Sequence, residues 1–356
     1  MKNIIGSLLL FVTSALTIGC GGGGGGVNVP GIPNPGSGPV VPQTAHVVVV
    51  VEENHSFPFV IGASSPMTFL NSLANQHALA TNYFANFHPS IDNYFMMTAG
   101  QPLAFAQGDG FPGPSNVDNL ARELVAANKT WKVYAENLPS VGWTGGDSSD
   151  GKYLKHHNPF AYFTDVIGTT QATNLVPFTQ FSTDLTNDQL PNFSFIVPNA
   201  RDDAHDCPDG TQNCADSIKL SNADTWLQNN IQPLLNNSAF QQDGLLVIVF
   251  DESFDADTAH GGGHVAMVMA GTKVKTNFQS TTLYQHQSLL RMIVEATGAS
   301  AFPGFSNVAP DMAEFFNPNG GAFTPPLLLR SRVCRAVRRT PRRTRAATAQ
   351  DRGVRR

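Results

Sequence analysis

The hydrophobic residues of this chain form short uninterrupted runs, and segments with helical spacing lie between them. Five such runs, at 46–52, 131–135, 193–197, 245–250 and 265–270, predict β-strands. A strand that is apolar on both faces belongs in the middle of a sheet that helices cover on each side, and such sheets are usually parallel. The chain is therefore expected to fold around a buried, mostly parallel sheet.

Four segments have apolar residues at helical spacing, namely 67–78, 118–128, 224–235 and 285–297. Asp118 is a candidate N-cap, because its side-chain oxygen can accept a hydrogen bond from a free backbone N–H of the first turn. Strands that alternate with helices predict an α/β fold, a sandwich of three layers with the sheet in the centre. The loop-rich stretch 137–191 is expected to cap an edge of the sheet.

The first twenty residues have the pattern of an export signal. Lys2 gives a positive start, residues 4–12 are mostly apolar, and the segment ends on Gly19-Cys20. The apolar run is short for a membrane span, so residues 1–20 are predicted to be a signal peptide. The Gly-Cys end resembles the bacterial lipobox, in which the cysteine is lipidated, although Thr17 replaces the usual aliphatic residue. This resemblance implies a lipid anchor on Cys20 in the cell envelope, and ordinary secretion is the alternative.

The rest of the chain divides by composition. Residues 21–43 are rich in Gly and Pro, which predicts a tether that is flexible at first and stiffer later. A globular domain is expected at 44–316. Eleven of the 22 Lys and Arg residues are arginines between 330 and 356, so the tail 317–356 is either a disordered extension or a basic arm for anionic lipid.

The arginine-rich tail hides the charge of the remaining chain. The whole chain has a net charge of −5, and the eleven arginines and one aspartate of the tail contribute ten positive charges, which leaves about −15 elsewhere. Nucleic acid is therefore not expected as a partner, because binding a phosphate backbone needs a basic face.

Two further cysteines, Cys207 and Cys214, lie seven residues apart in a polar segment. In the oxidising compartment that an export signal implies, they are expected to form a disulfide. Cys334 stands by itself in the arginine-rich tail.

Polar and acidic residues collect at the ends of the predicted strands. They are Glu52-Glu53-Asn54, Asn199 with Asp202-Asp203-Ala204-His205-Asp206, Asp251-Glu252, and His264 ahead of the last strand. Ligands of α/β sheets bind outside the carboxyl ends of the strands, so these side chains are expected to converge there. Carboxylates that converge repel one another unless a cation neutralises them. These groups suit zinc, manganese or calcium, with His205 and His264 as nitrogen ligands, although any single acid could instead be a helix cap.

Ser90 lies between Pro89 and a predicted helix that runs to about Ala99. Its hydroxyl and the free N–H groups of that helix would point the same way, and such a cradle binds phosphate. Ser90 could also serve as the N-cap of the helix, and the two roles are compatible.

Together these segments resemble the phosphoesterase family. The matching motifs are Glu53-Asn54-His55-Ser56, His88-Pro89-Ser90 with Asn93-Tyr94, Lys155-His156-His157-Asn158-Pro159-Phe160, Asp203-Ala204-His205-Asp206-Cys207, Asp251-Glu252-Ser253 and Gly261-Gly262-Gly263-His264. They follow in the family's order between about residues 46 and 298. The family includes acid phosphatases and phospholipases C of the phosphatidylcholine type, so the resemblance implies an alkaline-phosphatase-like fold.

The resemblance also implies a role for each matching residue. Ser90 would be the nucleophile that forms a phosphoserine intermediate and is activated by a metal. Asn93 would donate a hydrogen bond to a phosphate oxygen, and His157 would contact phosphate or protonate the leaving oxygen. The implied metal ligands are Glu53 with Asn54, Asp251 with Glu252, and a further metal- or phosphate-binding group of Asp203, His205 and His264. Relatives in the superfamily place Asp-His where this chain has Asp251-Glu252, so both one divalent ion and two are considered.

The expected function is metal-dependent hydrolysis of phosphate monoesters, of the acid-phosphatase type, with phosphoinositide or nucleotide phosphates among the candidate substrates. A phospholipase C that cleaves phosphodiesters is the first alternative, although the phospholipases of this family are usually larger. A non-catalytic surface lipoprotein with the same fold is the second. Small phosphate esters or phospholipid headgroups would be the partners, and the lipid anchor would hold the chain to the membrane.

Overall fold

The computed structural model describes residues 40–105 and 107–317. Its strands are β1 (His46–Glu52), β2 (Ala78–Ala80), β3 (Tyr83–Phe84), β4 (Trp131–Ala135), β5 (Leu175–Pro177), β6 (Phe193–Val197), β7 (Gly244–Phe250), β8 (Met267–Gly271), β9 (Phe278–Ser280) and β10 (Tyr284–Gln285). Its α-helices are α1 (Phe57–Val60), α2 (Thr68–Gln76), α3 (Ile91–Thr98), α4 (Leu120–Ala126), α5 (Thr179–Thr186), α6 (Asp216–Asn230), α7 (Gln232–Asn236), α8 (Ser238–Asp243) and α9 (His286–Thr297).

A central sheet orders its eight strands β5-β4-β6-β1-β7-β8-β2-β9. Neighbouring strands run parallel except β8, which is antiparallel to both β7 and β2. The first predicted strand, β1, is central, because Val47 pairs with Phe193 of β6 on one side and with Leu245 of β7 on the other. The predicted mostly parallel sheet is therefore confirmed.

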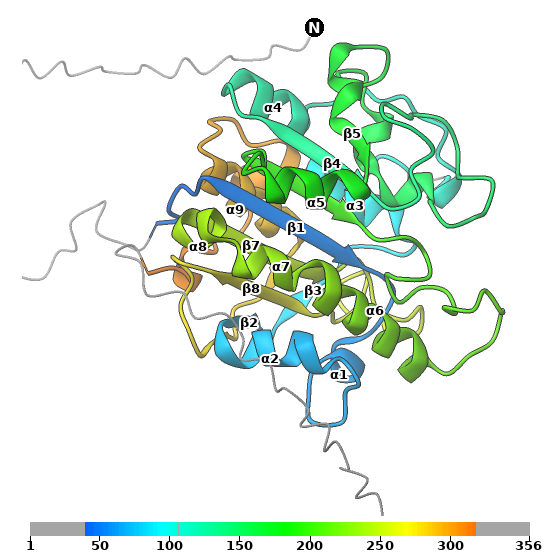
Figure 1. Cartoon of the computed structure of the whole chain (residues 1–356), viewed down its shortest axis with the longest axis vertical. Helices are drawn as coiled ribbons and strands as arrows, with labels where there is room; N and C mark the ends of the chain where they lie inside the picture. The colour runs from blue at the N-terminus through cyan, green and yellow to red at the C-terminus, as the bar shows by residue number, and fades with distance from the viewer. Residues whose placement is uncertain (1–39, 106, 318–356) are drawn as a thin grey trace, which may run out of the picture. The chain divides into compact units, whose positions relative to one another are not determined.

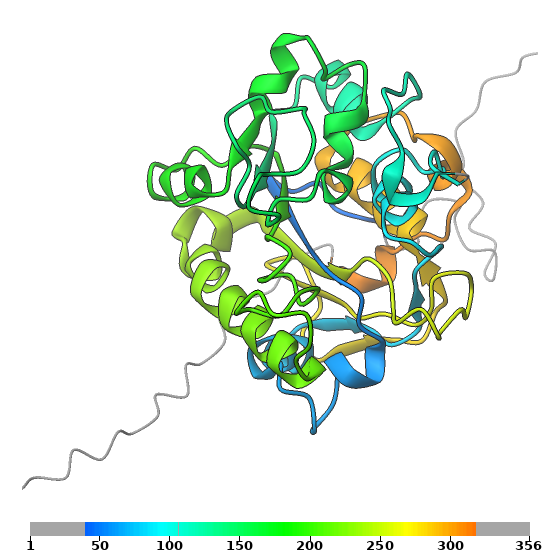
Figure 2. The same ribbon diagram turned by 90° about the vertical axis from the view of Figure 1, so that its right-hand side faces the viewer.

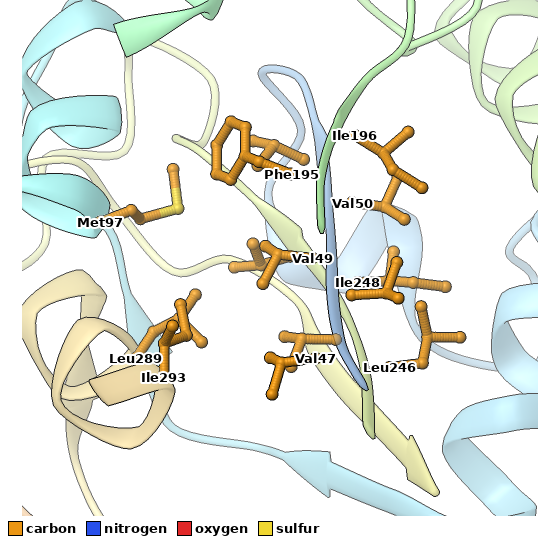
Figure 3. Packing of buried hydrophobic residues seen from close by; sticks show 14 of the residues in the cluster. Val47, Val49, Val50, Met97, Phe195, Ile196, Leu246, Ile248, Leu289 and Ile293 are labelled. Carbon is orange, nitrogen blue, oxygen red and sulfur yellow. The ribbon is translucent and has the colours of Figure 1, made fainter. Parts of the chain in front are cut away.

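Helices cover both faces of this sheet and give the three predicted layers (Figure 1). Helices α3, α4 and α9 lie behind the sheet in that view, and α6, α7 and α8 lie in front of it. Figure 3 shows Val47 of β1 on the same side of the strand as Leu289 and Ile293 of α9, whereas Val50 lies on the other side with Ile248. Since both faces of β1 pack against apolar side chains, its sequence needs no polar alternation.

The helix predicted at 224–235 is divided between two helices in the structure. Residues 224–230 belong to a longer helix, α6, which already begins at Asp216 and ends at Asn230. A separate short helix, α7, follows it with Pro233 in its first turn, where the missing N–H of proline is tolerated. The sequence pattern does not predict the first turns of α6, because their residues are mostly polar and carry little helical periodicity.

The cap of the helix expected at 118–128 is also corrected. Asn119 and not Asp118 caps α4, because the Asn119 side chain accepts from the backbone N–H of Arg122 at 3.1 Å. Asp118 instead accepts from the backbone N–H of Asn119 at 2.9 Å. The stretch 137–191 is more ordered than a loop-rich cap, because it contributes the edge strand β5 and the helix α5.

The carboxyl ends of the central strands lie on one side of the molecule. The arrowhead of β1 points to the right in Figure 1, and Figure 2 views the molecule from that side, where the loops after β1, β6 and β7 gather. Within the described residues, no helix is both long and apolar enough to cross a lipid bilayer. The predicted signal peptide, nearly all of the tether and the arginine-rich tail lie outside the described residues.

Candidate active site

Two adjacent strands and one helix bring five of the predicted site residues together. Glu53 and Asn54 follow β1, Asp251 and Glu252 follow the neighbouring strand β7, and Ser90 precedes the first residue of α3. The side chains of Glu53, Ser90, Asp251 and Glu252 are all buried. A cluster of three acids with so little solvent around it needs protons or a cation to balance its charge.

The Ser90 hydroxyl lies among the oxygens of this cluster. Its Oγ is 2.7 Å from Glu252 Oε1, 3.1 Å from Glu53 Oε2 and 3.5 Å from Asn54 Oδ1. One hydroxyl hydrogen can satisfy only one of these acceptors well. The side chain makes no capping bond to α3, although Ser90 occupies the N-cap position, and the backbone N–H of Ile91 donates to Asp109. Ser90 is thus oriented toward the carboxylates and not toward its own helix.

Asn54 brings a further oxygen to the same place. Its amide oxygen lies 2.6 Å from Glu53 Oε2 and 3.2 Å from Asp251 Oδ1. If the amide were turned, its nitrogen would take this place and would donate to both carboxylates. Oxygens this close repel one another unless the amide turns or a cation lies between them. The donor set of carboxylate, amide and hydroxyl oxygens fits a hard divalent cation.

A second group of donor atoms adjoins the first through Glu53. His157 Nε2 lies 3.3 Å from Glu53 Oε1, and His157 Nδ1 lies 3.4 Å from Asp203 Oδ2. One ligand atom from each of these three buried residues lies within 4.8 Å of the others, which is a spacing that a metal ion can bridge. Tyr94 stacks on the His157 ring and donates its hydroxyl hydrogen to Glu53 Oε1.

The pKa values in this cluster reflect the lack of solvent. Burial raises the pKa of Glu53 well above its usual value, with a further contribution from Asp251, and burial with the neighbouring Glu252 raises the pKa of Asp251 in the same direction. Burial raises the pKa of Asp203 to about 8 and lowers the pKa of His157 to about 3. His157 is therefore neutral and can offer a ring nitrogen to a cation, but it is a poor general acid.

Further evidence for a cation comes from polar atoms without partners. Among the described residues, Asp203 Oδ2, Asp251 Oδ2 and His157 Nε2 are buried and have no hydrogen-bond partner. Buried groups of this kind are normally paired, so a bound ion would account for them. The residues present therefore fit a divalent metal.

His88 was not singled out from the sequence, although it stands in the His-Pro-Ser motif. Its Nδ1 makes a close contact with Glu252 Oε2, and its Nε2 lies 3.0 Å from the carbonyl oxygen of Asp257. The hydrogen bond to Glu252 raises the pKa of His88 to about 9. His88 thus fixes the carboxylate that accepts from Ser90, and only the tertiary structure shows this pairing.

Asn93 and His205 have contacts other than the predicted ones. Asn93 Oδ1 accepts from the backbone N–H groups of Asn86 and Phe87, and its Nδ2 donates to the Phe87 carbonyl, so it braces the loop ahead of Ser90. His205 lies at the rim, with 37% of its side chain exposed and its Nδ1 bonded to Asp206.

His264 lies between two aromatic rings, outside both groups of donor atoms. It stacks on Phe57 at 4.4 Å and on Phe84 at 4.9 Å between ring centroids, and its Nε2 is 3.1 Å from the Thr81 carbonyl oxygen. These contacts give His264 a packing role, since its ring fills the gap between α1 and β3.

The glycines before His264 allow backbone segments to approach one another closely. A Cβ atom on Gly262 would lie 2.4 Å from the Phe87 carbonyl oxygen, and one on Gly263 would lie 1.8 Å from Ser253 Oγ. Backbone hydrogen bonds join Gly262 N–H to the Ala85 carbonyl and Ser253 N–H to the Gly262 carbonyl. The glycine segment therefore holds the loop before Ser90 against the loop after Glu252.

Cys207 and Cys214 form a disulfide, with their Cα atoms 5.8 Å apart. The bond closes part of the loop between Asp203 and the first residue of α6. The ring that it closes begins shortly after His205, at the rim of the site.

Comparison with known proteins adds independent findings. The residue pattern of the Phosphoesterase family matches residues 63–298. A phosphatidylinositol-3-phosphatase of Mycobacterium tuberculosis is 31% identical over 276 residues, which cover 78% of this chain and 84% of that protein. A probable acid phosphatase of Kluyveromyces lactis is 29% identical over 254 residues, which cover 69% of this chain and only 56% of the yeast protein.

Among solved structures, a protein in the alkaline phosphatase superfamily from Vibrio parahaemolyticus superposes with a TM-score of 0.55 and 14% identity. The superposition covers 76% of this chain and 72% of that one. The likeness concerns the fold, and it confirms the alkaline-phosphatase-like architecture expected from the sequence.

Proposed function

This chain belongs to the phosphoesterase family, and we propose that it hydrolyses phosphate monoesters with the Ser90 hydroxyl as nucleophile. The observation that supports this most directly is the placement of Ser90 Oγ, 2.7 Å from Glu252 Oε1 and 3.1 Å from Glu53 Oε2. The relatives named above are phosphatases, which favours monoesters over the diesters of a phospholipase C.

In the proposed reaction, Ser90 Oγ attacks phosphorus while its proton passes to Glu252. The bond from phosphorus to the ester oxygen breaks, and the alcohol leaves after taking a proton from solvent. Glu252 then returns its proton to solvent, and water attacks the phosphoserine while Glu252 takes a proton from that water. The bond from phosphorus to Ser90 Oγ breaks, Oγ recovers a proton from Glu252, and inorganic phosphate leaves. His88 holds Glu252 in the orientation that both steps need.

We assign the divalent cation of this reaction to Glu53, Asn54, Asp251 and Glu252 beside Ser90, with His157 and Asp203 as the donors of a second group. A bound cation would neutralise the carboxylates and lower the pKa of the serine hydroxyl. Oxygen donors suit calcium or manganese, and the His157 nitrogen suits zinc or manganese.

The test is the change Ser90→Ala, with Ser148→Ala as matched control. Ser148 is a loop serine whose hydroxyl bonds Asp150, outside the proposed site. We expect Ser90→Ala to lower kcat on an aryl phosphate by at least about a thousandfold and Ser148→Ala to stay within about twofold. Trapping of phosphate on the wild-type chain in acid, and not on Ser90→Ala, would report the intermediate. Full activity in Ser90→Ala would refute the assignment.

We also infer that the protein acts outside the cytoplasm, held to a membrane through Cys20. The Gly19-Cys20 end of the signal pattern supports this, and so does the disulfide between Cys207 and Cys214, since structural disulfides persist in oxidising compartments.

A further inference from the structure

A cavity of about 440 Å³ adjoins the candidate active site. Residues that line it include Asn54, His55, His205, Asp216, Lys219 and Phe254. Asn54 belongs to both places, because its amide oxygen is 3.5 Å from Ser90 Oγ. The walls come from the first turn of α6 and from the loops after β1, β6 and β7, and these loops gather on the side of the molecule that Figure 2 faces. The size is typical of sites for small molecules.

His55 presents an unsatisfied polar atom on the wall of this cavity. The side chain is only 2% exposed, and Nδ1 is 3.1 Å from the carbonyl oxygen of Glu53. A carbonyl can only accept, so Nδ1 carries the hydrogen and Nε2 is left for another partner. Among the described residues Nε2 has no hydrogen-bond partner, since Asp216 Oδ1 is 3.7 Å away. A buried polar atom of this kind favours a ligand group that completes its hydrogen bond.

The charges of the lining restrict what the cavity can hold. Three acids, Asp206, Asp216 and Asp255, outnumber the one lysine, Lys219. This excess of negative charge disfavours a second phosphate or a carboxylate. An ammonium group could pair with the acids, but it would offer Lys219 no acceptor. Because most lining groups are polar, an acyl chain would leave them without hydrogen bonds.

Hydroxyl groups match this lining best, because each can both donate and accept. They can donate to Asp216 and to His55, and they can accept from Lys219. The edge-to-face pair of His55 and Phe254, with ring centroids 4.8 Å apart, gives an apolar surface beside these polar groups.

We propose that this cavity binds the alcohol part of the substrate, and that this part is an uncharged polyhydroxyl group such as a sugar or cyclitol ring. The proposal rests on the phosphomonoesterase function proposed above. It assigns substrate selection to His55, Asp216 and Lys219, none of which takes part in the proposed chemical steps.

The test compares two monoesters, glucose 6-phosphate and an aryl phosphate, on the full chain and on Lys219→Met and Asp216→Asn. We expect kcat/KM for the sugar phosphate to fall at least tenfold in each variant, and kcat/KM for the aryl phosphate to stay within twofold. Lys129→Met, a change at a separate pocket beside the start of β4, should affect neither ester. Thermal unfolding of each variant checks that it is folded.

The outcomes separate this inference from the proposed function. Equal losses on both esters, or no loss on either, would overturn the polyol subsite while leaving the phosphatase proposal intact. A larger loss on phosphocholine than on glucose 6-phosphate would also overturn it, in favour of an ammonium-bearing alcohol. A wild-type chain that hydrolyses no ester under any metal supplement would overturn the proposed function itself.

Discussion

At the scale of single residues, Glu53 joins the two groups of donor atoms. Its Oε2 faces Ser90 and Asn54, while its Oε1 faces Tyr94 and His157. A single cation would use one of these sets, and a pair of cations would share the Glu53 carboxylate. The geometry is compatible with one cation or with two, and the Asp251-Glu252 motif leaves the same two possibilities.

The raised pKa values of this cluster predict a cation affinity that depends on pH. Burial raises the pKa of Asp203 from 3.8 to about 8, and the pKa values of Glu53 and Asp251 rise in the same direction. A cation must displace these protons, so each proton released makes the affinity about tenfold stronger per pH unit. We expect manganese to bind at least tenfold more tightly at pH 7.5 than at pH 5.5, as measured by calorimetry.

The cation-free chain should show the opposite trend in stability. An acid whose pKa is raised by folding binds more protons in the folded state, so its contribution to stability is lost as pH rises from about 4 to about 8. Melting temperature after treatment with a chelator should therefore fall across that range, and added manganese should restore more of it at pH 7.5 than at pH 5.5. Asp203→Asn should flatten both curves. The same manganese effect at both pH values would contradict the assignment of these acids.

The residue scale also shows where sequence reasoning stops. Ser90, Glu53 and Asp251 could be chosen because they stand at strand and helix ends, where the fold directs side chains to one edge. His88 and Glu252 lie far apart in the sequence, so no local pattern indicates that their side chains pair. His264 shows that a residue chosen from the sequence can have another role. A histidine after a glycine motif looks the same in the sequence whether it binds a metal or, as here, packs between Phe57 and Phe84.

At the scale of elements, long apolar runs were predictable and short pairings were not. The strands β1, β4 and β6 have the predicted boundaries, because each is a buried run that a turn signal ends. Strands β3 and β10 have only two residues each, and they exist because they pair with each other across 201 positions of the chain. Such pairings come from tertiary contacts and leave no periodic pattern.

The close packing of the glycine segment predicts that one added methyl group would disturb two neighbouring loops. In Gly262→Ala, the new Cβ would lie 2.4 Å from the Phe87 carbonyl oxygen, so the loop before α3 must move away from the loop after β7. We expect a loss of about 1–3 kcal/mol in stability and at least a tenfold fall in kcat, since Ser90 and Glu252 sit on these loops. Gly146→Ala is the control, because nothing lies within 4 Å of its added Cβ. Unchanged thermal unfolding in Gly262→Ala would show that the close approach relaxes freely.

At the scale of the whole molecule, the net charge is consistent with the proposed export. Outside the arginine-rich tail the net charge is about −15. The disulfide between Cys207 and Cys214 crosslinks the loop beside the site. Under the proposed function, bound cations would allow a chain of this charge to hold an anionic ester next to buried carboxylates. An exported protein has access to such ions and to conditions that keep Cys207 and Cys214 oxidised.

The proposed anchor gives the whole chain a testable location. If Cys20 carries lipid, the full chain expressed in a bacterial host should enter the detergent phase when membranes are extracted, and Cys20→Ser should enter the aqueous phase. Cys334→Ser removes the cysteine of the arginine-rich tail and should behave like the wild type. Phosphatase activity per mole should agree in all three, because the proposed catalytic residues lie within 53–252. A wild-type chain found in the aqueous phase, with the signal peptide removed, would instead establish ordinary secretion.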